Sequence, residues 1–355
     1  MKLLTFSLLD DSAAARRLGV LSRDERMVHD LAAGAAAMGQ ATPAVLDMLG
    51  FLEGGEPARE EAQRISDWIA RQQPAGCVHR ADQVRWLAPV PRPRSIRDCM
   101  TVERHALQCM RAVVRDRCRP LAWLDGALSR WFGRGWLRVP EVWRERPVYY
   151  KGNPSSVVGH DAEVRWPSYT RRLDYELEFG IFIGRPGRNI PLERAAAHIG
   201  GYTIFNDFSA RDVQVREMAA RLGPSKGKDF DTGNAMGPCL VTADEIPDPY
   251  GLTMVARVNG VEWSRGTSAE LGWSFEEMIA AISAEETLAP GEFIGSGAIG
   301  NGCGWEVDRW LAPGDVVELE VERLGILRNR IVAPDGGPSS IAPAGTRARA
   351  RTARA

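Results

Sequence analysis

The chain has 355 residues, of which 44% are hydrophobic, so it can build a large core, and its length predicts two domains or one large domain with an appendage. Lysine and arginine number 45 against 46 aspartate and glutamate residues, which leaves a net charge of -1. This balance gives no electrostatic reason to expect nucleic acid or an anionic membrane as a partner.

Residues 1–92 are interpreted as an N-terminal α/β domain. The alternating segment KLLTFSLL predicts a strand, and Asp10 and Asp11 interrupt the apolar residues too early for a signal peptide. No later run of about 18 apolar residues predicts a membrane span, so we expect a cytoplasmic protein. PAREEAQRISDWIARQQ predicts an amphipathic helix, and the proline-dense connector APVPRPRS (88–95) marks the domain boundary.

Residues 93–333 are interpreted as a catalytic domain in which strands outnumber helices. Helices are expected over 99–114, within 191–199 and after Ser209, and Asn259-Gly260 is typical of a hairpin turn. This pattern predicts an α+β, β-rich fold rather than a doubly wound sheet. Residues 334–355 are rich in Pro, Gly, Ala and Arg without periodicity, and we expect them to be disordered. The clearest predicted strand segments are GIFIG, GYTIF, PCLVT, LTMVARVNGVEW, EFIGSG and DVVELEVERLG.

Two patterns predict what the protein does not bind. The six cysteines form no C-x-x-C pair and no zinc-site spacing, so we expect reduced thiols, and any bound metal should be hard and oxygen-ligated. Gly295, Gly297 and Gly300 spell G-x-G-x-x-G, but the helix that a dinucleotide site requires does not follow. A tight loop where backbone approaches a ligand is the better interpretation.

The segment LDYELEFGIFIG (173–184) has the apolar residues of a strand but carries Asp174, Glu176 and Glu178. Side chains two apart share one face of a strand, so these three acids repel one another unless a cation compensates them. Further acidic and basic residues occur in three other segments, and convergence of their carboxylates would make a Mg²⁺ or Ca²⁺ site. These residues are Asp98, His105, Asp207, Arg211, Gln214 and Lys228.

Each of these residues has a simpler interpretation. Acids on a strand face are most often solvated, and an Asp after a strand is most often a turn or cap residue, for which Ser209 is equally suited. His105 could be a structural residue of its helix. Lys228, between Gly227 and Asp229, would ordinarily be a surface charge of a loop.

The strings ELE, NDFSARDVQ and KDFDT, in this order, resemble the fumarylacetoacetate hydrolase family over about residues 96–330. The resemblance implies a mixed β-roll or sandwich catalytic domain, preceded by a smaller N-terminal domain and usually dimeric. It implies a divalent cation, Mg²⁺ or alternatively Mn²⁺ or Ca²⁺, held by Glu176, Glu178 and Asp207. The spacing of Asp98 and His105 matches the larger, fumarylacetoacetase-like members, in which Asp98 would be a fourth ligand.

The resemblance also implies roles for other residues. His105 would be the catalytic base, oriented by Glu306 in GSGAIGNGCGWE, and Lys228 would stabilise an oxyanion. The residues implied to contact the substrate are Arg211, Gln214, Tyr150 and Ala298. Met100 and Met218 replace residues that are commonly Tyr, and Ala298 replaces one that is commonly Thr. The loss of these hydroxyls argues against fumarylacetoacetate itself as the substrate.

The expected reaction is hydrolysis of a carbon–carbon bond in a 1,3-dicarbonyl acid, such as an acylpyruvate. His105, oriented by Glu306, would activate water, and the metal would act as a Lewis acid. The alternative on the same scaffold is decarboxylation, isomerisation or hydration of a 2-oxo acid, which needs only enolate stabilisation and proton transfer. In both cases we expect a small-molecule partner and a homodimer.

Overall fold

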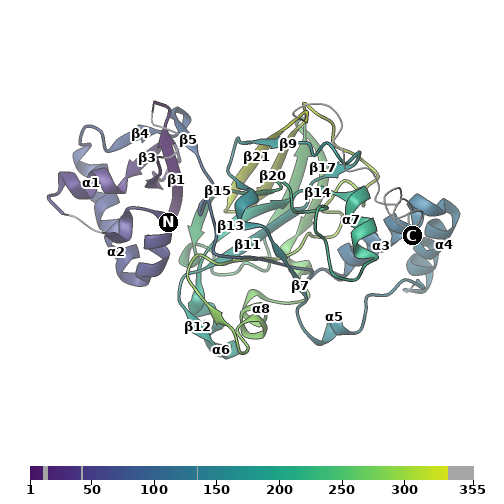
Figure 1. The fold of residues 1–355 in the computed structure, drawn as a ribbon. Helices are drawn as coiled ribbons and strands as arrows, with labels where there is room; N and C mark the ends of the chain where they lie inside the picture. The colour runs from purple at the N-terminus through teal and green to yellow at the C-terminus, as the bar shows by residue number, and fades with distance from the viewer. Residues whose placement is uncertain (11–14, 41–42, 134, 335–355) are drawn as a thin grey trace, which may run out of the picture.

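A computed structural model of the protein describes residues 1–10, 15–40, 43–133 and 135–334. Apart from its first residue, the tail predicted to be disordered therefore lies outside the described residues. The described part is an α+β fold dominated by strands, as the sequence predicts (Figure 1). In this part of the chain, no helix is both long and apolar enough to cross a membrane.

The N-terminal segment forms one end of the molecule (Figure 1). Its helix α2 buries Ala58, Ala62, Ile65 and Ile69, which recur at helical spacing, so it packs by the apolar face that the sequence predicts. The elements are the strands β1 (Lys2–Leu8), β2 (Arg17–Leu21), β3 (Met27–Asp30), β4 (Val78–Arg80) and β5 (Val84–Trp86), and the helices α1 (Leu31–Ala37) and α2 (Met48–Gln72).

The largest sheet of the described residues is mixed and has twelve strands. Strand β1 pairs with β15, so the proposed boundary at residue 92 divides one hydrogen-bonded sheet. From β1 the order continues β15-β13-β11-β19-β6-β7, and β19 and β6 run parallel. These strands and the short β8 are β15 (Asn234–Thr242), β13 (Ile199–Asp207), β11 (Leu177–Ile183), β19 (Phe293–Gly295), β6 (Ile96–Cys99), β7 (Tyr149–Gly152) and β8 (Val157–Val158).

A second sheet of five strands packs on the first. Buried residues of both sheets, such as Ile181, Ile204, Leu319 and Leu327, belong to one hydrophobic core, which therefore lies between them. Asn259-Gly260 forms the predicted turn, with both residues at positive φ. In order, the five strands are β17 (Val261–Thr267), β16 (Thr253–Val258), β20 (Val316–Val321), β21 (Gly325–Val332) and β9 (Glu163–Arg165).

Helices lie around the two sheets, and α4 lies at the end opposite the N-terminal segment (Figure 1). Helix α3 begins at Glu103, later than the predicted start at residue 99, because Cys99 still belongs to strand β6; α7 follows Ser209 as predicted. Of the region 191–199, only the first half is α-helical, followed by a 3₁₀ turn. The helices are α3 (Glu103–Arg117), α4 (Arg119–Phe132), α5 (Val142–Glu145), α6 (Leu192–Ala195), α7 (Arg211–Met218) and α8 (Phe275–Ile282).

The segment 173–184 is not the single strand that its pattern predicts. It breaks at Tyr175 and Glu176 into β10 (Leu173–Asp174), which pairs with β14 (Ser209–Ala210), and β11, which pairs with β13. A separate pair is formed by β12 (Gly187–Arg188) and β18 (Thr287–Leu288). The break lets the acids of this segment face different partners, although all three remain close together.

The loop after β19 approaches β6 closely, and its glycines allow this. Gly297 has a φ of +76°, and an added Cβ would lie 2.1 Å from the carbonyl oxygen of Cys99. Gly260 has the same φ of +76° with nothing within 4 Å of an added Cβ. Both glycines therefore adopt a positive φ that other residues rarely adopt, but only at Gly297 would an added side chain also clash with a neighbour.

We predict that Gly297→Ala lowers the free energy of unfolding by about 1–3 kcal/mol more than Gly260→Ala does, because only Gly297 adds overpacking to backbone strain. Urea denaturation of the two variants and the wild type measures this difference. Equal losses would show that the loop after β19 moves away from Cys99 at little cost.

Candidate active site and metal centre

Three buried carboxylates from three strands of the large sheet meet at one point. Asp98 lies on β6, Glu178 on β11 and Asp207 at the end of β13, and their ligand oxygens lie within 4.8 Å of one another. Among the described residues, Asp98 Oδ1, Glu178 Oε2 and Asp207 Oδ1 have no hydrogen-bond partner. Gly295 leaves space for this cluster, because a Cβ there would lie 2.3 Å from Asp98 Oδ1.

The carboxylate cluster (Asp98, Glu178 and Asp207) is electrostatically suited to a cation. Burial and the nearby charge of Asp207 raise the pKa of Asp98 to about 8, and burial raises the pKa of Asp207 to about 6. Burial and the neighbouring Asp98 raise the pKa of Glu178 well above its usual range. Three such oxygens without partners fit a hard divalent cation, which prefers oxygen ligands.

Two buried basic residues compensate the other acids of the segment 173–184. Arg211, on α7, donates from Nε to Asp174 at 2.9 Å and from Nη2 to Glu176 at 2.8 Å. Lys228 donates to both Glu176 and Asp207. Burial alone would raise the pKa of Glu176, but the charges of Arg211 and Lys228 outweigh it and lower the pKa.

The structure places Glu176 beside the carboxylate cluster rather than in it. Its carboxylate is held by Arg211 and Lys228, and Lys228 joins it to Asp207. Its role as a metal ligand, which the resemblance implies, therefore stays a prediction.

The observed burial and helix capping contradict the simpler interpretations of the acidic residues and Lys228. Glu176, Glu178 and Lys228 are only 5%, 1% and 5% exposed, so they are neither a solvated strand face nor a loop surface. Neither Asp207 nor Ser209 caps α7, whose N-cap is Ala210 without a side-chain hydrogen bond.

Asp174 has a structural role that the sequence pattern does not reveal. Its carboxylate accepts the backbone N–H groups of Gly304 and Trp305 at 2.8 and 3.1 Å, in addition to Arg211. It therefore ties the loop after β19 to the strand segment that carries Glu176. The acid-rich segment itself was the available signal, since Asp174 lies two residues before Glu176.

His105 and Glu306 form a buried pair next to the cluster. His105 Nδ1 lies 3.1 Å from Glu306 Oε2, and its Nε2 lies 3.6 Å from Glu176 Oε1. Glu306 also accepts the backbone N–H groups of Asn301 and Cys303 at 3.1 and 3.0 Å, which fixes its orientation. Burial would lower the pKa of His105, but the adjacent Cys109 and Glu306 raise it well above its usual value.

The remaining predicted residues surround this network. Tyr150 donates from its hydroxyl to Asp207 Oδ2 at 2.7 Å, and Gln214 accepts from Arg211 Nη1 at 3.0 Å. Hydrogen bonds, ion pairs or proximity within the carboxylate cluster thus link every predicted site residue except Ala298. Ala298 is buried in the loop after β19, where its methyl group offers no hydrogen bond to a substrate.

Glu217, near the end of α7, organises the loop that carries Lys228. It accepts backbone N–H groups from Ser225, Lys226 and Gly227 at 2.8 to 2.9 Å. No sequence motif indicates this contact, because it depends on how α7 and the following loop fold back on each other.

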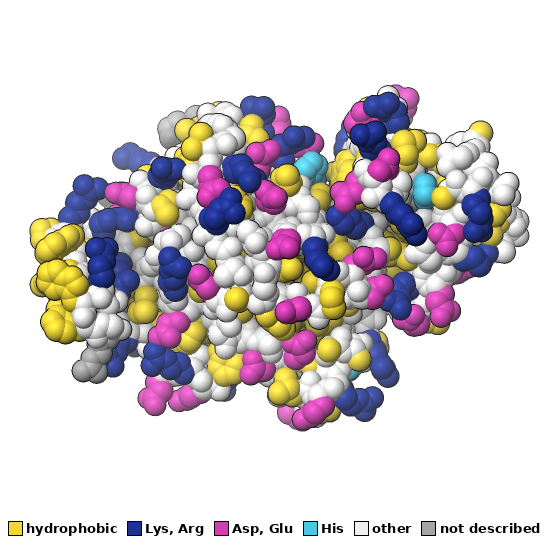
Figure 2. All heavy atoms as spheres, turned by 180° about the vertical axis from the view of Figure 1, so that it is seen from behind, with side chains coloured by type: hydrophobic (Ala, Val, Ile, Leu, Met, Phe, Trp, Pro, Cys, Tyr) yellow, Lys and Arg dark blue, Asp and Glu magenta, His cyan; other side chains and the backbone are white. Residues whose placement is uncertain are grey.

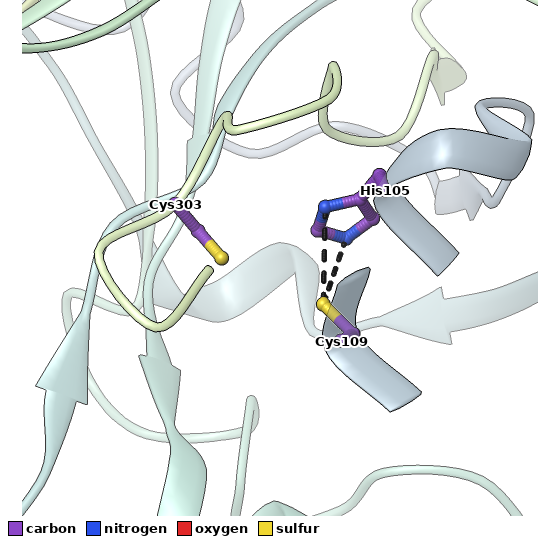
Figure 3. A group of neighbouring side chains, drawn as sticks. All are labelled: His105, Cys109 and Cys303. Atoms are coloured by element: carbon purple, nitrogen blue, oxygen red, sulfur yellow. Dashed lines mark hydrogen bonds between the residues drawn. The ribbon is translucent and has the colours of Figure 1, made fainter. Parts of the chain in front are cut away.

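Two cysteines that the sequence left unassigned lie beside His105. Figure 3 shows Cys109 and Cys303 directed toward the imidazole ring, with Cys109 on the same helix and Cys303 on the loop after β19. The spacing of His105 and Cys109, four residues apart on a helix, was a usable signal. Cys303 is too distant in sequence for any spacing to have revealed it.

Comparison with known proteins agrees with the family resemblance of the sequence motifs. A family model described as fumarylacetoacetate (FAA) hydrolase C-terminal matches residues 130–332. The human protein named oxaloacetate tautomerase FAHD2A, mitochondrial, is 32% identical over 286 residues, which are 80% of this chain and 79% of the human protein.

Solved structures share the fold over nearly the whole chain. A putative HpcE protein from Mycobacterium smegmatis is 26% identical with a TM-score of 0.68, covering 94% of this chain and 100% of that one. The maleylpyruvate hydrolase from Sphingobium sp. SYK-6, in complex with manganese(II) ion and pyruvate, is 22% identical with a TM-score of 0.65 over 94% and 100%. At 22% identity, the likeness to the maleylpyruvate hydrolase shows the fold alone.

We predict that Mn²⁺ raises the melting temperature of the wild type, because an ion that binds only the folded state stabilises it by about 2.7 kcal/mol at a hundredfold excess over its dissociation constant. Asp98→Asn should abolish this shift, while Asp67→Asn, an exposed change on α2, should keep it. Differential scanning fluorimetry of chelator-treated protein measures both. An undiminished shift in Asp98→Asn would remove Asp98 from the ligand set.

Proposed function

Because the chain belongs to the fumarylacetoacetate hydrolase family, we propose that it is a divalent-metal-dependent enzyme that interconverts the keto and enol forms of a small 2-oxo acid. The observation that carries the proposal is the buried network that joins the carboxylate cluster through Glu176 to the pair of His105 and Glu306. The name of the human relative, oxaloacetate tautomerase, supports the reaction class and a 2-oxo diacid as substrate.

Asp98, Glu178 and Asp207 would hold the metal, with Glu176 as the further ligand that the family resemblance implies. When bound, the ion supplies Lewis acidity for the oxygens of a 2-oxo acid. Mg²⁺ is the proposed ion, and Mn²⁺ and Ca²⁺ suit the same oxygen donors. The Tyr150 hydroxyl and Lys228 both donate to Asp207, so they fix the direction of its remaining oxygen.

His105 is proposed to carry the proton. In the enol-to-keto direction its imidazolium donates a proton to the carbon next to the 2-oxo group, and the C=C electron pair forms the new C–H bond. The enol O–H bond breaks, its electron pair completes the C=O bond and its proton returns to the imidazole, so the keto form arises without any other reactant. Glu306 holds Nδ1 at 3.1 Å and stabilises the imidazolium, which leaves Nε2 directed at Glu176 and the cluster.

The buried cations would orient the substrate. Arg211 is 3% exposed and Lys228 5%, and both lie against Glu176 at the edge of the carboxylate cluster. Positive charge held there favours an anionic oxygen that develops on the substrate. Gln214, which is bound to Arg211, is proposed to contact the substrate carboxylate.

Hydrolysis of a carbon–carbon bond in a 1,3-dicarbonyl acid is the second candidate. It is favoured by the orientation of the His–Glu pair, since a fixed base that could activate water is what this reaction requires. Met100, Met218 and Ala298 supply no hydroxyl groups, which weighs against fumarylacetoacetate as the acid. Tautomerisation is preferred because the 32%-identical relative that matches 80% of this chain carries that name.

We propose the cytoplasm as the compartment and a homodimer as the assembly. All six cysteines are free thiols, which suits a reducing compartment. On α4, Leu124, Trp131 and Phe132 are 44%, 75% and 70% exposed, and hydrophobic side chains gather at this end of the molecule (Figure 2). An exposed apolar surface of this kind is typical of an interface.

We predict that His105→Ala lowers kcat for enol-to-keto conversion of oxaloacetate by about 10²–10⁴-fold, because the proton carrier is lost. The Mn²⁺-induced rise in melting temperature should remain, and His160→Ala, which removes a ring packed on Trp86, should keep wild-type turnover. Ultraviolet absorption follows the enol, and proton NMR identifies the products. Unchanged turnover in His105→Ala would refute its role, and cleavage of an acylpyruvate into two acids would favour the second candidate.

We also predict that light scattering gives the mass of two chains for the wild type and of one chain for Trp131→Glu, since a buried charge disrupts an apolar interface. Leu222→Glu, at a residue 94% exposed outside α4, is the matched control and should remain dimeric. A dimer that persists in Trp131→Glu would place the interface elsewhere.

A further inference from the structure

We infer that His105, Cys109 and Cys303 form a second metal site, selective for a borderline-soft divalent cation such as Zn²⁺ and separate from the carboxylate cluster. The ligand atoms of these three residues lie within 4.8 Å of one another. They come from one turn of α3 and from the loop after β19, and all three point to a common centre (Figure 3).

The distances suit tetrahedral coordination. Zn²⁺ binds nitrogen at about 2.1 Å and sulfur at about 2.3 Å, which puts neighbouring ligand atoms of a tetrahedron roughly 3.5–3.8 Å apart. Cys109 Sγ lies 3.6 Å from His105 Nε2 and 3.8 Å from Nδ1, so a rotation of the imidazole ring would align the Nε2 lone pair with the metal. Three protein ligands leave a fourth position for water, so the predicted site is an open one.

The surroundings of His105 match those of a zinc-bound histidine. Such a histidine usually gives its second ring N–H to a carboxylate, which fixes the tautomer that presents the other nitrogen to the metal. Glu306 Oε2 lies 3.1 Å from Nδ1 and is itself held by the N–H of Cys303. Because Nδ1 is held by Glu306, Nε2 is the ring nitrogen that remains for the metal.

Charge also favours the site. A hydrogen bond from Cys303 and the charge of His105 lower the pKa of Cys109 to about 6, although burial opposes this. Arg211 is a positive charge close to both sulfurs. Cys303 is fully buried, whereas the residue Cys109 is partly exposed. On binding, each thiol that forms a metal–sulfur bond releases its proton to solvent, and no oxidation occurs.

Ligand hardness separates the two sites. Carboxylate oxygens select Mg²⁺ and Mn²⁺, whereas thiolates and imidazole select Zn²⁺ and Co²⁺. Occupation of Nε2 would remove the proton carrier, so, if the proposed function holds, Zn²⁺ should stop turnover without displacing the ion at the carboxylate cluster.

The test uses reduced full-length protein with Mg²⁺ in excess and adds Co²⁺ as a spectroscopic probe. We expect one equivalent of Co²⁺ to give thiolate-to-cobalt charge-transfer absorption in the near ultraviolet and tetrahedral bands in the visible, both removed by Zn²⁺. Cys109→Ser and Cys303→Ser should each lose most of the charge-transfer absorption. Cys118→Ser, at an exposed cysteine outside the cluster, should retain it.

Each other outcome is decisive. Cobalt bands without sulfur absorption, or sulfur absorption that survives in both Cys109→Ser and Cys303→Ser, would overturn the site. The Mn²⁺-induced rise in melting temperature confirms that a variant is folded, and Cys109→Ser at the partly exposed position covers the case in which Cys303→Ser fails to fold. Because these readouts need no turnover, they stand or fail independently of the proposed reaction.

Discussion

A surplus of buried negative charge is the constraint on which the rest of this structure depends. Among the residues that the structure describes, the site gathers six carboxylates and two permanently charged cations, Arg211 and Lys228. An unpaired buried carboxylate costs several kcal/mol, so the arrangement persists only if protons or a bound cation make up the difference. The raised pKa values of Asp98, Glu178 and Asp207 show where the compensation is missing. The six are Asp98, Asp174, Glu176, Glu178, Asp207 and Glu306.

The fold meets this constraint by dividing the charges between partners. The break at Tyr175 and Glu176 directs Asp174 to the loop after β19 and Glu176 to Arg211 and Lys228. The strand order β13-β11-β19-β6 then leaves Asp207, Glu178 and Asp98 together with Gly295 between β11 and β6. Without a side chain at that glycine, the carboxylates can approach one another, and a cation has room to bind them.

Local patterns predicted the elements and most of the site residues, but not their pairing. Strand alternation, the Asn259-Gly260 turn and the amphipathic face of α2 are decided by nearby residues, so they could be read directly. The break in 173–184 could not, because it depends on the pairing of β10 with β14, whose residues lie farther along the chain. Likewise, the cluster that brings Cys303 near His105 joins residues almost two hundred positions apart. Motif resemblance found Glu306, since its segment is recognisable, but only the folded loop reveals the cysteine beside it.

The position of His105 limits what the site can do at one time. Its Nε2 lies 3.6 Å from Glu176 Oε1 and 3.6 Å from Cys109 Sγ, which is also 3.8 Å from Nδ1, while Nδ1 lies 3.1 Å from Glu306 Oε2. The same nitrogen therefore lies close to a carboxylate oxygen and to a thiol sulfur. Zn²⁺ binds nitrogen and sulfur more tightly than Mn²⁺ does, so competition for this atom is decided by which metals are available and not by the carboxylate cluster. A nitrogen that holds a metal cannot carry a proton, and the chemistry of the site follows from which of the two His105 holds.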